Sequence, residues 1–405
     1  MAKFLFGWEF GGGMGHAGPI SEFAKRLIQR GHDVEAITKN AYTSTVAFGG
    51  FNVPCYSLPK PVKPKKKIEP TVSMAEVLYN VGYHSSASLA VKIAAWHNLV
   101  KSIRPDVLIV NYAPSAILAA RALSIPTLQF GTGFEIPPPV VPMPGFAVFS
   151  DIPGQRLEKS EKGVTGKVNR ALGRLGLAAI DSLAEAFRAD QNILVTFPEL
   201  DHYQNREEGR YVGPLVSAPF PSEPPWPAGH HPSKRIFCYL KGAHAGTEKL
   251  LRVLGSCEAN VLVYASGLSA TKRQALETQS LRFSDRPVDV KQACSASDFV
   301  VCHAGHGTVT AALMHGAGML LLPEKSNLEQ QNTALNIQRL GIGFALSPAS
   351  GEQRMTQALN DLFESNSQSQ CEILQGKYSD FDPESAWECL LTEAERLAKS
   401  HQPQL

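Results

Sequence analysis

The sequence of 405 residues has few cysteines, few charged residues and no long uninterrupted hydrophobic run, and each of these scarcities excludes a class of protein. No basic leader precedes the first apolar stretch, which is broken by Glu9, so we expect neither a signal peptide nor a transmembrane segment. The seven cysteines are scattered without a C-x-x-C pair, which predicts reduced thiols in a cytoplasmic protein. Peripheral contact with a membrane stays open.

Charge of either sign is also scarce. Charged residues make up 19% of the chain and its net charge is +2, which predicts no nucleic-acid partner. One basic run, Lys60–Lys67 (KPVKPKKK), could attract an anionic acceptor or a membrane surface, but most such runs are solvated loops and it receives no role here. A chain of 405 residues exceeds a single core and predicts two domains.

A strand, a glycine turn and the start of a helix are predicted in the stretch VCHAGHGTVTAAL, residues 301–313. Phe299–Cys302 is apolar enough for a strand, and Gly305 and Gly307 permit a tight turn before a helix that opens at Thr308. The first amides of such a helix point their N–H groups outward, where a phosphate or a carboxylate binds. Because glycine is common in the strand-to-helix turns of any α/β protein, this motif alone is a weak signal.

A second turn of the same kind lies near the start of the chain, in KFLFGWEFGGGMGHAGPISEFAKRLIQRGHDV. Lys3–Phe10 is predicted as a buried strand, Gly11–Gly15 as a flexible loop, and Pro19–Arg30 as an amphipathic helix that ends at Gly31. Each turn places a histidine beside glycine. Two such units predict two nucleotide-binding halves that face each other across a cleft.

Strand and helix signals alternate along the whole chain, which predicts an α/β fold of parallel sheets with crossover helices. The strongest interruption is Gly213–Arg235, whose seven prolines cannot lie inside a helix or a central strand. Ser73 and Glu76 form a capping pattern for a helix that runs toward Ile103, and a last helix covers about Glu384–Lys399. The predicted strands are Lys3–Gly7, Asp33–Ile37, Val107–Val110, Thr127–Phe130, Ile193–Thr196, Arg235–Leu240, Val261–Ala265, Phe299–Cys302 and Met319–Leu322.

Three stretches together resemble the UDP-glycosyltransferase superfamily, the GT-B enzymes with two facing Rossmann-like domains that glycosylate small hydrophobic molecules. They are GGGMGHAGPISEFAKRLIQRGHDV, RPDVLIV…AARALSIPTLQFGTG and HAGHGTVTAALMHGAGMLLLPEKSNLEQQNTALNIQRLGIG. The likeness is greatest to bacterial enzymes of the macrolide-glycosyltransferase type. It implies an acceptor-binding domain over residues 1–212, a proline-rich linker over 213–234, a nucleotide-sugar-binding domain over 235–380, and a C-terminal helix over 381–405 that we expect to pack back on the first domain.

In such enzymes the second domain holds a nucleotide diphosphate sugar, with the diphosphate at the glycine turn. The resemblance places His303, the backbone amides of the turn and the Thr308 hydroxyl around the diphosphate, without a metal or a cofactor. Glu329 and Gln330 match the acidic residue and the glutamine that hydrogen-bond the sugar hydroxyls. The predicted donor-binding residues are His303, Gly305, His306, Gly307, Thr308, Glu324, Glu329 and Gln330.

One departure from the family pattern concerns the ribose. Three residues after Thr308 the superfamily usually has a glutamate that binds the ribose hydroxyls, and this chain has Ala311. Either the donor is a dTDP-sugar, whose deoxyribose offers one hydroxyl fewer than that of a UDP-sugar, or Glu324 reaches the ribose instead.

The catalytic candidate is His16, which matches the base of the family. An inverting transfer requires a base that removes the proton of the acceptor hydroxyl, and a neutral histidine is suited to this near pH 7. Where many relatives have an aspartate that orients this histidine, the chain has Asn111. An asparagine orients an imidazole without stabilising its positive charge, so either catalysis is weaker or another acid, Glu9 or Glu135, serves.

The acceptor is expected to bind the first domain. The apolar stretch Gly131–Phe149 follows the carboxyl end of a strand, where ligands of open α/β sheets bind. Tyr83, His84 and Trp96 can contribute from the preceding helix, although an aromatic side chain on a helix is more often part of the core. The predicted acceptor-binding residues are Gly15, Tyr83, Phe134, Glu135 and Phe146.

The sequence therefore predicts an inverting, metal-independent glycosyltransferase that moves a sugar from a nucleotide diphosphate donor to a hydroxyl of a small hydrophobic acceptor. Two alternatives stay open. One is a sugar-nucleotide epimerase, which can share the two-domain fold. The other is a non-catalytic nucleotide-sugar-binding protein, which the departures at Asn111 and Ala311 make plausible.

Overall fold

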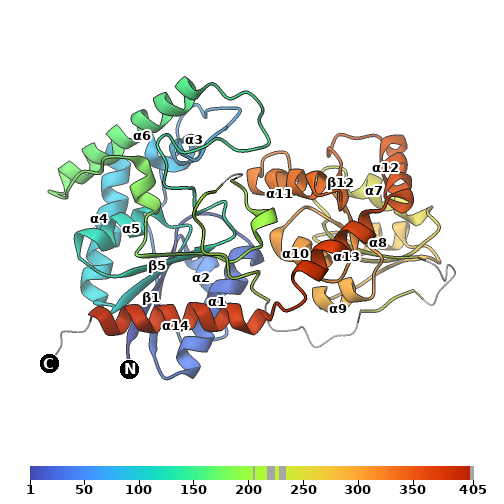
Figure 1. Ribbon diagram of the computed structural model, residues 1–405, viewed down its shortest axis with the longest axis horizontal. Coiled ribbons are helices and arrows are strands. Elements are labelled where there is room, and N and C mark those ends of the chain that lie inside the picture. Colours follow the sequence, from blue (N-terminus) through green and yellow to red (C-terminus); the bar gives the residue numbers. More distant parts are fainter. Residues whose placement is uncertain (204–205, 217–223, 228–233, 402–405) are drawn as a thin grey trace. The chain divides into compact units, whose positions relative to one another are not determined.

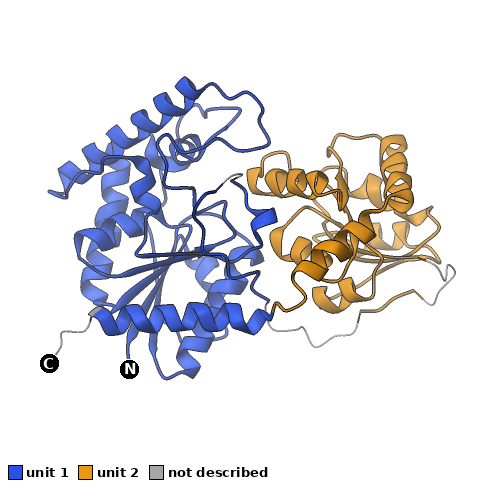
Figure 2. Ribbon diagram, in the orientation of Figure 1, with its two compact units in different colours: residues 1–217, 382–405 blue, residues 218–381 orange. Residues whose placement is uncertain are grey.

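The chain divides into two compact units, described from a computed structural model that covers residues 1–203, 206–216, 224–227 and 234–401. Unit 1 consists of residues 1–217 and 382–405, and unit 2 of residues 218–381 (Figure 2). Residues 217–223 and 228–233, which fall in the predicted proline-rich linker, lie outside the described residues.

Unit 1 contains a six-stranded parallel sheet in the order β3-β2-β1-β4-β5-β6. The chain builds one half of this sheet outward from β1 and the other half outward from β4, so the strand order reverses between β1 and β4 (Figure 1). Ligands of open parallel sheets bind beside such a reversal, at the carboxyl ends of the strands. The strands are β1 (Lys3–Trp8), β2 (Asp33–Thr38), β3 (Cys55–Ser57), β4 (Val107–Asn111), β5 (Thr127–Gly131) and β6 (Gln191–Leu194).

The helices of unit 1 cover both faces of this sheet. One apolar face packs against α1, α2 and α14, and the other against α4 and α5, which explains why the central strands are apolar along their whole length. The helices are α1 (Met14–Gln29), α2 (Ala41–Phe48), α3 (Met74–Leu78), η1 (Tyr79–Tyr83), α4 (Ser86–Ile103), α5 (Pro114–Ala122), α6 (Gly154–Arg174), η2 (Leu183–Phe187), η3 (Pro198–Leu200) and α14 (Pro383–His401).

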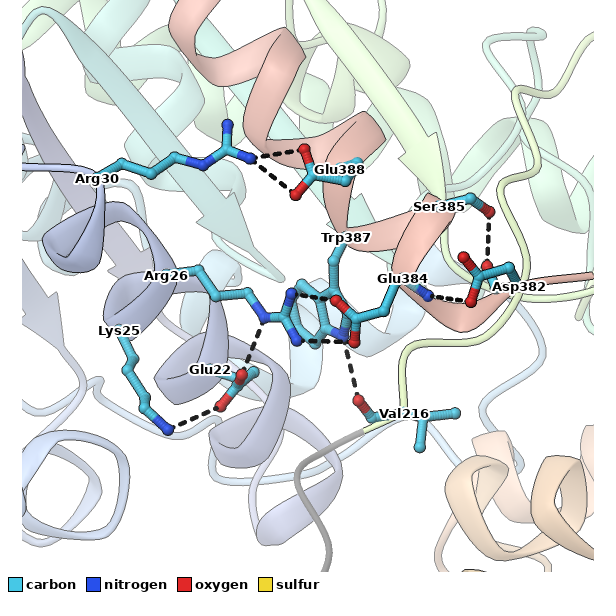
Figure 3. A network of polar contacts seen from close by, with 10 residues as sticks. All are labelled: Glu22, Lys25, Arg26, Arg30, Val216, Asp382, Glu384, Ser385, Trp387 and Glu388. Carbon is cyan, nitrogen blue, oxygen red and sulfur yellow. Dashed lines mark hydrogen bonds and ion pairs between the residues drawn. The ribbon is translucent and has the colours of Figure 1, made fainter.

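The last helix, α14, belongs to unit 1 although it follows unit 2 in the sequence. Two nitrogens of Arg26 donate to the two carboxylate oxygens of Glu384 at 2.6 and 3.0 Å, and one nitrogen of Arg30 donates to both oxygens of Glu388 at 2.7 and 2.6 Å (Figure 3). The Arg26 guanidinium also lies 5.0 Å from the centre of the Trp387 ring. The apolar face that α14 buries against the sheet is formed by Trp387, Leu390, Leu391, Ala394, Leu397 and Ala398.

Unit 2 repeats the same architecture. Its six-stranded parallel sheet has the order β12-β11-β10-β7-β8-β9, so the reversal lies between β7 and β10. The strands are β7 (Arg235–Lys241), β8 (Asn260–Ser266), β9 (Leu281–Phe283), β10 (Phe299–Cys302), β11 (Gly318–Leu321) and β12 (Gly343–Ala345). The helices are α7 (Thr247–Gly255), α8 (Ala270–Leu276), α9 (Val290–Ser295), α10 (His306–Met314), α11 (Leu328–Arg339), α12 (Glu352–Glu364) and α13 (Ser367–Lys377).

The predicted α/β class with parallel sheets in two halves is confirmed. The cysteines are all free thiols. Among the described helices, none is both long enough and apolar enough to cross a bilayer.

Two helix predictions are wrong in detail. The first helix begins a turn before Pro19, because Gly13 adopts a φ of 80° and its carbonyl accepts the N–H groups of His16 and Ala17 at 3.4 and 3.2 Å. Part of the predicted loop Gly11–Gly15 is thus helical. The helix predicted from Ser73 toward Ile103 begins with the expected Ser73 cap but is broken into α3, η1 and α4, because Gly82 has a φ of 124° that no helix accommodates.

Candidate active site

The first candidate site lies at the centre of the unit 1 sheet, where β1 and β4 end side by side. Trp8 and Asn111 are register partners at these strand ends. His16 lies in the first turn of α1, and its Nδ1 is 2.7 Å from Oδ1 of Asn111. The amide nitrogen of Asn111 donates to the carbonyl of Phe130 at 3.0 Å, which turns Oδ1 toward the imidazole. His16 therefore carries its proton on Nδ1, and its Nε2 has the lone pair of a base.

The glycine loop leaves room for this imidazole. A Cβ on Gly11 would come within 2.3 Å of Nε2 of His16, and Gly11 has a φ of 74°, so glycine alone fits here. Gly15 lies exposed in the same segment, at the open start of α1. The Lys39 ammonium, just after β2, donates to the Gly11 carbonyl and lies 5.5 Å from the centre of the Trp8 ring. Burial lowers the pKa of Lys39. Lys39 is not among the residues predicted from the sequence, although its place directly after a strand was a signal.

Aromatic side chains extend from His16 toward the predicted acceptor loop. The Tyr112 ring is stacked 6.5 Å from the His16 ring and meets the Phe134 ring edge-on at 6.2 Å. Phe134 in turn stacks on Phe146 at 5.1 Å. Tyr112 has a φ of 51°, a strained conformation for a residue with a side chain, and such strain concentrates at functional sites.

Three of the predicted acceptor contacts, Tyr83, Glu135 and Phe146, do not fit the structure, because all three are buried. Tyr83 and Phe146 are each 0% exposed, and the Tyr83 hydroxyl is hydrogen-bonded to Ser115 at 2.7 Å. The Tyr83 ring packs against Phe10 and the Phe146 ring against Phe134, and neither offers a surface to a ligand. The sequence alone could not distinguish the aromatic residues that face the site from those that are packed behind them, because both sets are aromatic.

The alternative acids, Glu9 and Glu135, are also occupied elsewhere. The Glu9 carboxylate accepts hydrogen bonds from Lys92 at 2.9 Å and from the N–H and hydroxyl of Ser115 at 3.0 Å each. The Glu135 carboxylate is buried and accepts the N–H of Thr132 at 3.1 Å. The hydrogen-bond partner of the His16 ring is Asn111.

The second candidate site lies at the equivalent place in unit 2, where β7 and β10 end side by side. His303 directly follows β10 and is buried. Its Nε2 accepts the backbone N–H of Lys241 at 2.9 Å, so its Nδ1 carries the proton that is donated to the Leu322 carbonyl at 2.8 Å. Burial lowers the pKa of His303 to about 4. The imidazole is neutral and joins three strand ends, so the predicted donation from His303 to a phosphate does not fit this arrangement.

The turn after His303 leads into the start of α10. The predicted start at Thr308 is wrong by half a turn, because the Gly305 carbonyl accepts the N–H groups of both Thr308 and Val309, at 3.1 and 3.0 Å. The residues of the first turn, His306 to Thr308, are partly or fully exposed. Ala304 has a φ of 59°, the second strained residue directly beside a strand reversal. A helix start of this kind offers amide hydrogens and a positive dipole end to an anion.

Polar side chains from β7, β11 and α11 surround the same edge of the sheet. The Lys241 ammonium is 2.6 Å from Oε1 of Glu324, and this ion pair lowers the pKa of Glu324. The Gln330 side-chain oxygen accepts the backbone N–H of Glu324 at 2.8 Å, which leaves the Gln330 amide nitrogen as a donor. Glu329 is half-buried in the first turn of α11. The structure thus brings all the predicted donor-binding residues to one end of the sheet.

A third glycine turn, GAHAGT after β7, lies at this edge and was not predicted. Its His244 ring lies 4.1 Å from the His303 ring, and burial lowers the pKa of His244. Gly246 has a φ of 87°, and a Cβ there would come within 2.8 Å of the Pro348 carbonyl. The strand-glycine-helix pattern that identified the other two turns is present here as well, and it was the available signal.

Comparisons with known proteins agree with this geometry. Residues 256–378 match the family model of the glycosyltransferase family 28 C-terminal domain, which includes the β10–α10 turn and all of α11. The PGL/p-HBAD biosynthesis glycosyltransferase of Mycobacterium tuberculosis is 24% identical over 294 residues, which cover 68% of each chain.

Solved structures share the architecture of the whole chain. The glycotransferase of kitacinnamycin superposes with a TM-score of 0.71 at 16% identity and covers 99% of each chain. CalG4, the calicheamicin glycosyltransferase, has a TM-score of 0.70 at 16% identity with 99% of each chain covered. VinC, a glycosyltransferase solved in complex with dTDP, has a TM-score of 0.68 at 15% identity over 98% of this chain and 100% of VinC.

The chain has the GT-B fold, with two Rossmann-like units. It is a glycosyltransferase whose second unit matches the family 28 C-terminal domain, and the resemblance read from the sequence is confirmed.

Proposed function

We propose that this glycosyltransferase transfers a sugar from a nucleotide diphosphate to a hydroxyl of a small hydrophobic acceptor, with inversion and without a metal. The observation that carries the proposal is the hydrogen bond of 2.7 Å between His16 and Asn111 at the strand reversal of unit 1. It presents Nε2 of His16 at the exposed glycine loop, where a hydroxyl can approach.

In the proposed reaction His16 is the catalytic base. The proton of the acceptor hydroxyl passes to Nε2 as the acceptor oxygen forms a bond to the anomeric carbon. The bond from that carbon to the diphosphate oxygen breaks in the same step, and the nucleoside diphosphate leaves with its electron pair. Asn111 is a positioning residue: its Oδ1 accepts the Nδ1 proton, so the tautomer stays correct while the ring becomes positive.

The donor is proposed to bind unit 2 with its diphosphate at the start of α10. Backbone amides of the turn and the Thr308 hydroxyl stabilise the leaving charge, and Glu329 with the Gln330 amide nitrogen binds sugar hydroxyls. His303 is assigned an indirect role, which is to hold the ends of β7, β10 and β11 in register. The dTDP bound to VinC supports a thymidine donor, because Ala311 offers no group to a ribose hydroxyl.

Metal independence is proposed because the helix start can take the charge of the diphosphate. Within the residues that the structure describes, no three His, Cys, Asp or Glu side chains cluster in a way that could hold a metal ion. Activity that disappears in a chelator and returns with magnesium or manganese would overturn this part of the proposal.

The experiment that tests the proposal combines a donor panel with His16→Ala. Calorimetry should show that dTDP or UDP binds the wild-type chain and the variant alike, whereas turnover of the variant falls by roughly 10²–10⁴, the usual contribution of a positioned base. Thr308→Ala is the matched opposite control, with weaker donor binding and an intact base. Near-normal turnover of His16→Ala would show that this histidine is structural. Conversion of the sugar nucleotide without any acceptor would favour the epimerase.

A further inference from the structure

Two segments of unit 1 together carry a larger net positive charge than the whole chain does. Residues 59–73 and helix α6 together contain eleven Lys or Arg and three Asp or Glu, whereas the whole chain contains 39 and 37. The rest of the chain therefore has more acidic than basic residues. A charge asymmetry of this size within a nearly neutral chain indicates a partner surface of the opposite sign.

These two segments lie side by side. Arg156, in the first turn of α6, donates to the Pro70 carbonyl at 2.7 Å and forms an ion pair with Glu76 at 2.8 Å. Farther along the helix, the Lys167 ammonium lies 5.6 Å from the centre of the Tyr79 ring. The ribbon shows α6 running beside α3 and the loop that precedes it (Figure 1). We call the outer face of this loop and of α6 the basic surface.

Nine of the eleven cations are exposed and have no carboxylate partner among the described residues. This differs from the face between α1 and α14, where Arg26 and Arg30 are paired with glutamates (Figure 3). Unpaired cations retain their attraction for an external anion. The exposed cations of the basic surface are Lys60, Lys63, Lys65, Lys66, Lys67, Lys159, Lys162, Arg170 and Arg174.

Exposed valines lie on the basic loop and on two segments that contact this loop or α6. Val140 and Val141 lie in a loop that is hydrogen-bonded to α6, because the backbone N–H of Met143 donates to Glu161 at 2.6 Å. Two others line one hollow of about 410 Å³ beside Lys60, between the basic loop and α4. The four are Val62 (56% exposed), Val91 (59%), Val140 (51%) and Val141 (69%). Exposed apolar side chains among lysines are typical of a surface that meets the headgroup layer of a membrane.

We propose that the basic surface docks this glycosyltransferase on a bilayer that contains anionic lipid. The lysines bind headgroup phosphates, and the valines enter the interface between the headgroups and the acyl chains. A nucleic acid fits less well, because neither the loop of residues 59–73 nor α6 contains a Phe, Tyr or Trp on which a base could stack. This inference does not depend on the role proposed for His16.

The test measures co-sedimentation of the full chain with sucrose-loaded vesicles of phosphatidylcholine, alone or mixed with phosphatidylglycerol. The wild-type chain should sediment with the mixed vesicles only, and less as salt rises. The variant Lys65→Gln/Lys66→Gln/Lys67→Gln should bind about a hundredfold more weakly, at about fivefold for each lysine. Its matched control, Lys101→Gln/Lys291→Gln/Lys399→Gln, removes the same charge from exposed positions elsewhere and should bind as the wild type does.

A second variant tests the apolar part of the surface. Val140→Ser/Val141→Ser should weaken binding to the mixed vesicles severalfold while it leaves the salt dependence unchanged. Equal binding to both kinds of vesicle, or an equal loss in the two lysine variants, would overturn the proposal. So would binding of the chain to RNA without binding to vesicles. Transfer to a water-soluble acceptor should be the same in the two lysine variants as in the wild type, which separates a failure of docking from a failure of the proposed chemistry.

Discussion

Replacing Asn111 tests whether His16 acts as a base whose imidazole is kept in one orientation and tautomer by Asn111. Asn111 is buried and makes two hydrogen bonds, to His16 at 2.7 Å and to the Phe130 carbonyl at 3.0 Å. In Asn111→Ala the ring loses the acceptor that fixes its tautomer, so kcat should fall roughly 10- to 100-fold. The Phe130 carbonyl is left unpaired in the interior, which should cost about 1–3 kcal/mol of unfolding free energy.

Asn111→Asp separates orientation from charge. The carboxylate still accepts the Nδ1 proton, and its charge strengthens that bond by about 1 kcal/mol once the ring is positive, so kcat should be retained or rise up to about fivefold. Its second oxygen takes the place of the amide nitrogen, 3.0 Å from the Phe130 carbonyl, where two acceptors face each other without a hydrogen. The variant should therefore be less stable than the wild type although it is at least as active.

The assay is the initial rate at saturating donor and acceptor, with urea unfolding of each variant and calorimetry of donor binding as controls. Donor affinity should be the same in wild type, Asn111→Ala and Asn111→Asp. A wild-type kcat in Asn111→Ala would refute the reasoning, and so would a folded Asn111→Asp protein without turnover.

Three further predictions concern stability. The pKa of His303 is about 4 in the folded chain against an ordinary 6.5, so the unfolded chain binds the proton first as the pH falls. Stability should fall by about 3 kcal/mol between pH 7 and pH 4, and the urea midpoint of His303→Gln should depend less on pH over this range; an equal slope would contradict the assignment. Lys92→Met should cost about 3–5 kcal/mol, because it leaves the buried Glu9 charge unpaired, and adding Glu9→Gln should recover most of this loss. Trp387→Ala should lower the free energy of unfolding of unit 1 by about 3–5 kcal/mol, measured by thermal unfolding, without weakening donor binding. Weaker donor binding in this variant would show that α14 affects unit 2.

The sequence predicts the central strands well and the edges of the sheets poorly. β10 spans Phe299–Cys302 as predicted, because a buried central strand is apolar at every position. The strands β3, β9 and β12 were missed, since each has three residues and too little sequence for a pattern. Helix α6 was also missed, because its glycines and many charged residues obscure the helical pattern of its few buried residues.

The pairing of His16 with Asn111 was anticipated from the resemblance, which matches these positions to a base and its orienting residue, and both residues adjoin the ends of strands that are neighbours in the sheet. The role of His303 could not be anticipated from the sequence. Its partners are backbone groups at the ends of two other strands, at Lys241 and Leu322, and a backbone group leaves no signature in a sequence. Lys39 was overlooked for a related reason: its contact is a carbonyl oxygen.

The position of α14 has a consequence for how the polypeptide is made. Unit 2 is inserted between the two parts of unit 1, so a ribosome finishes unit 2 before it has supplied the last element of unit 1. Until Trp387 emerges and packs beside Phe23, at a ring distance of 6.3 Å, the part of this apolar face that α14 buries stays exposed, and only α1 and α2 cover the rest. The unit that is synthesised first is thus the last to be completed. During that interval the nascent chain exposes apolar surface, which makes it prone to aggregate and a target for chaperones.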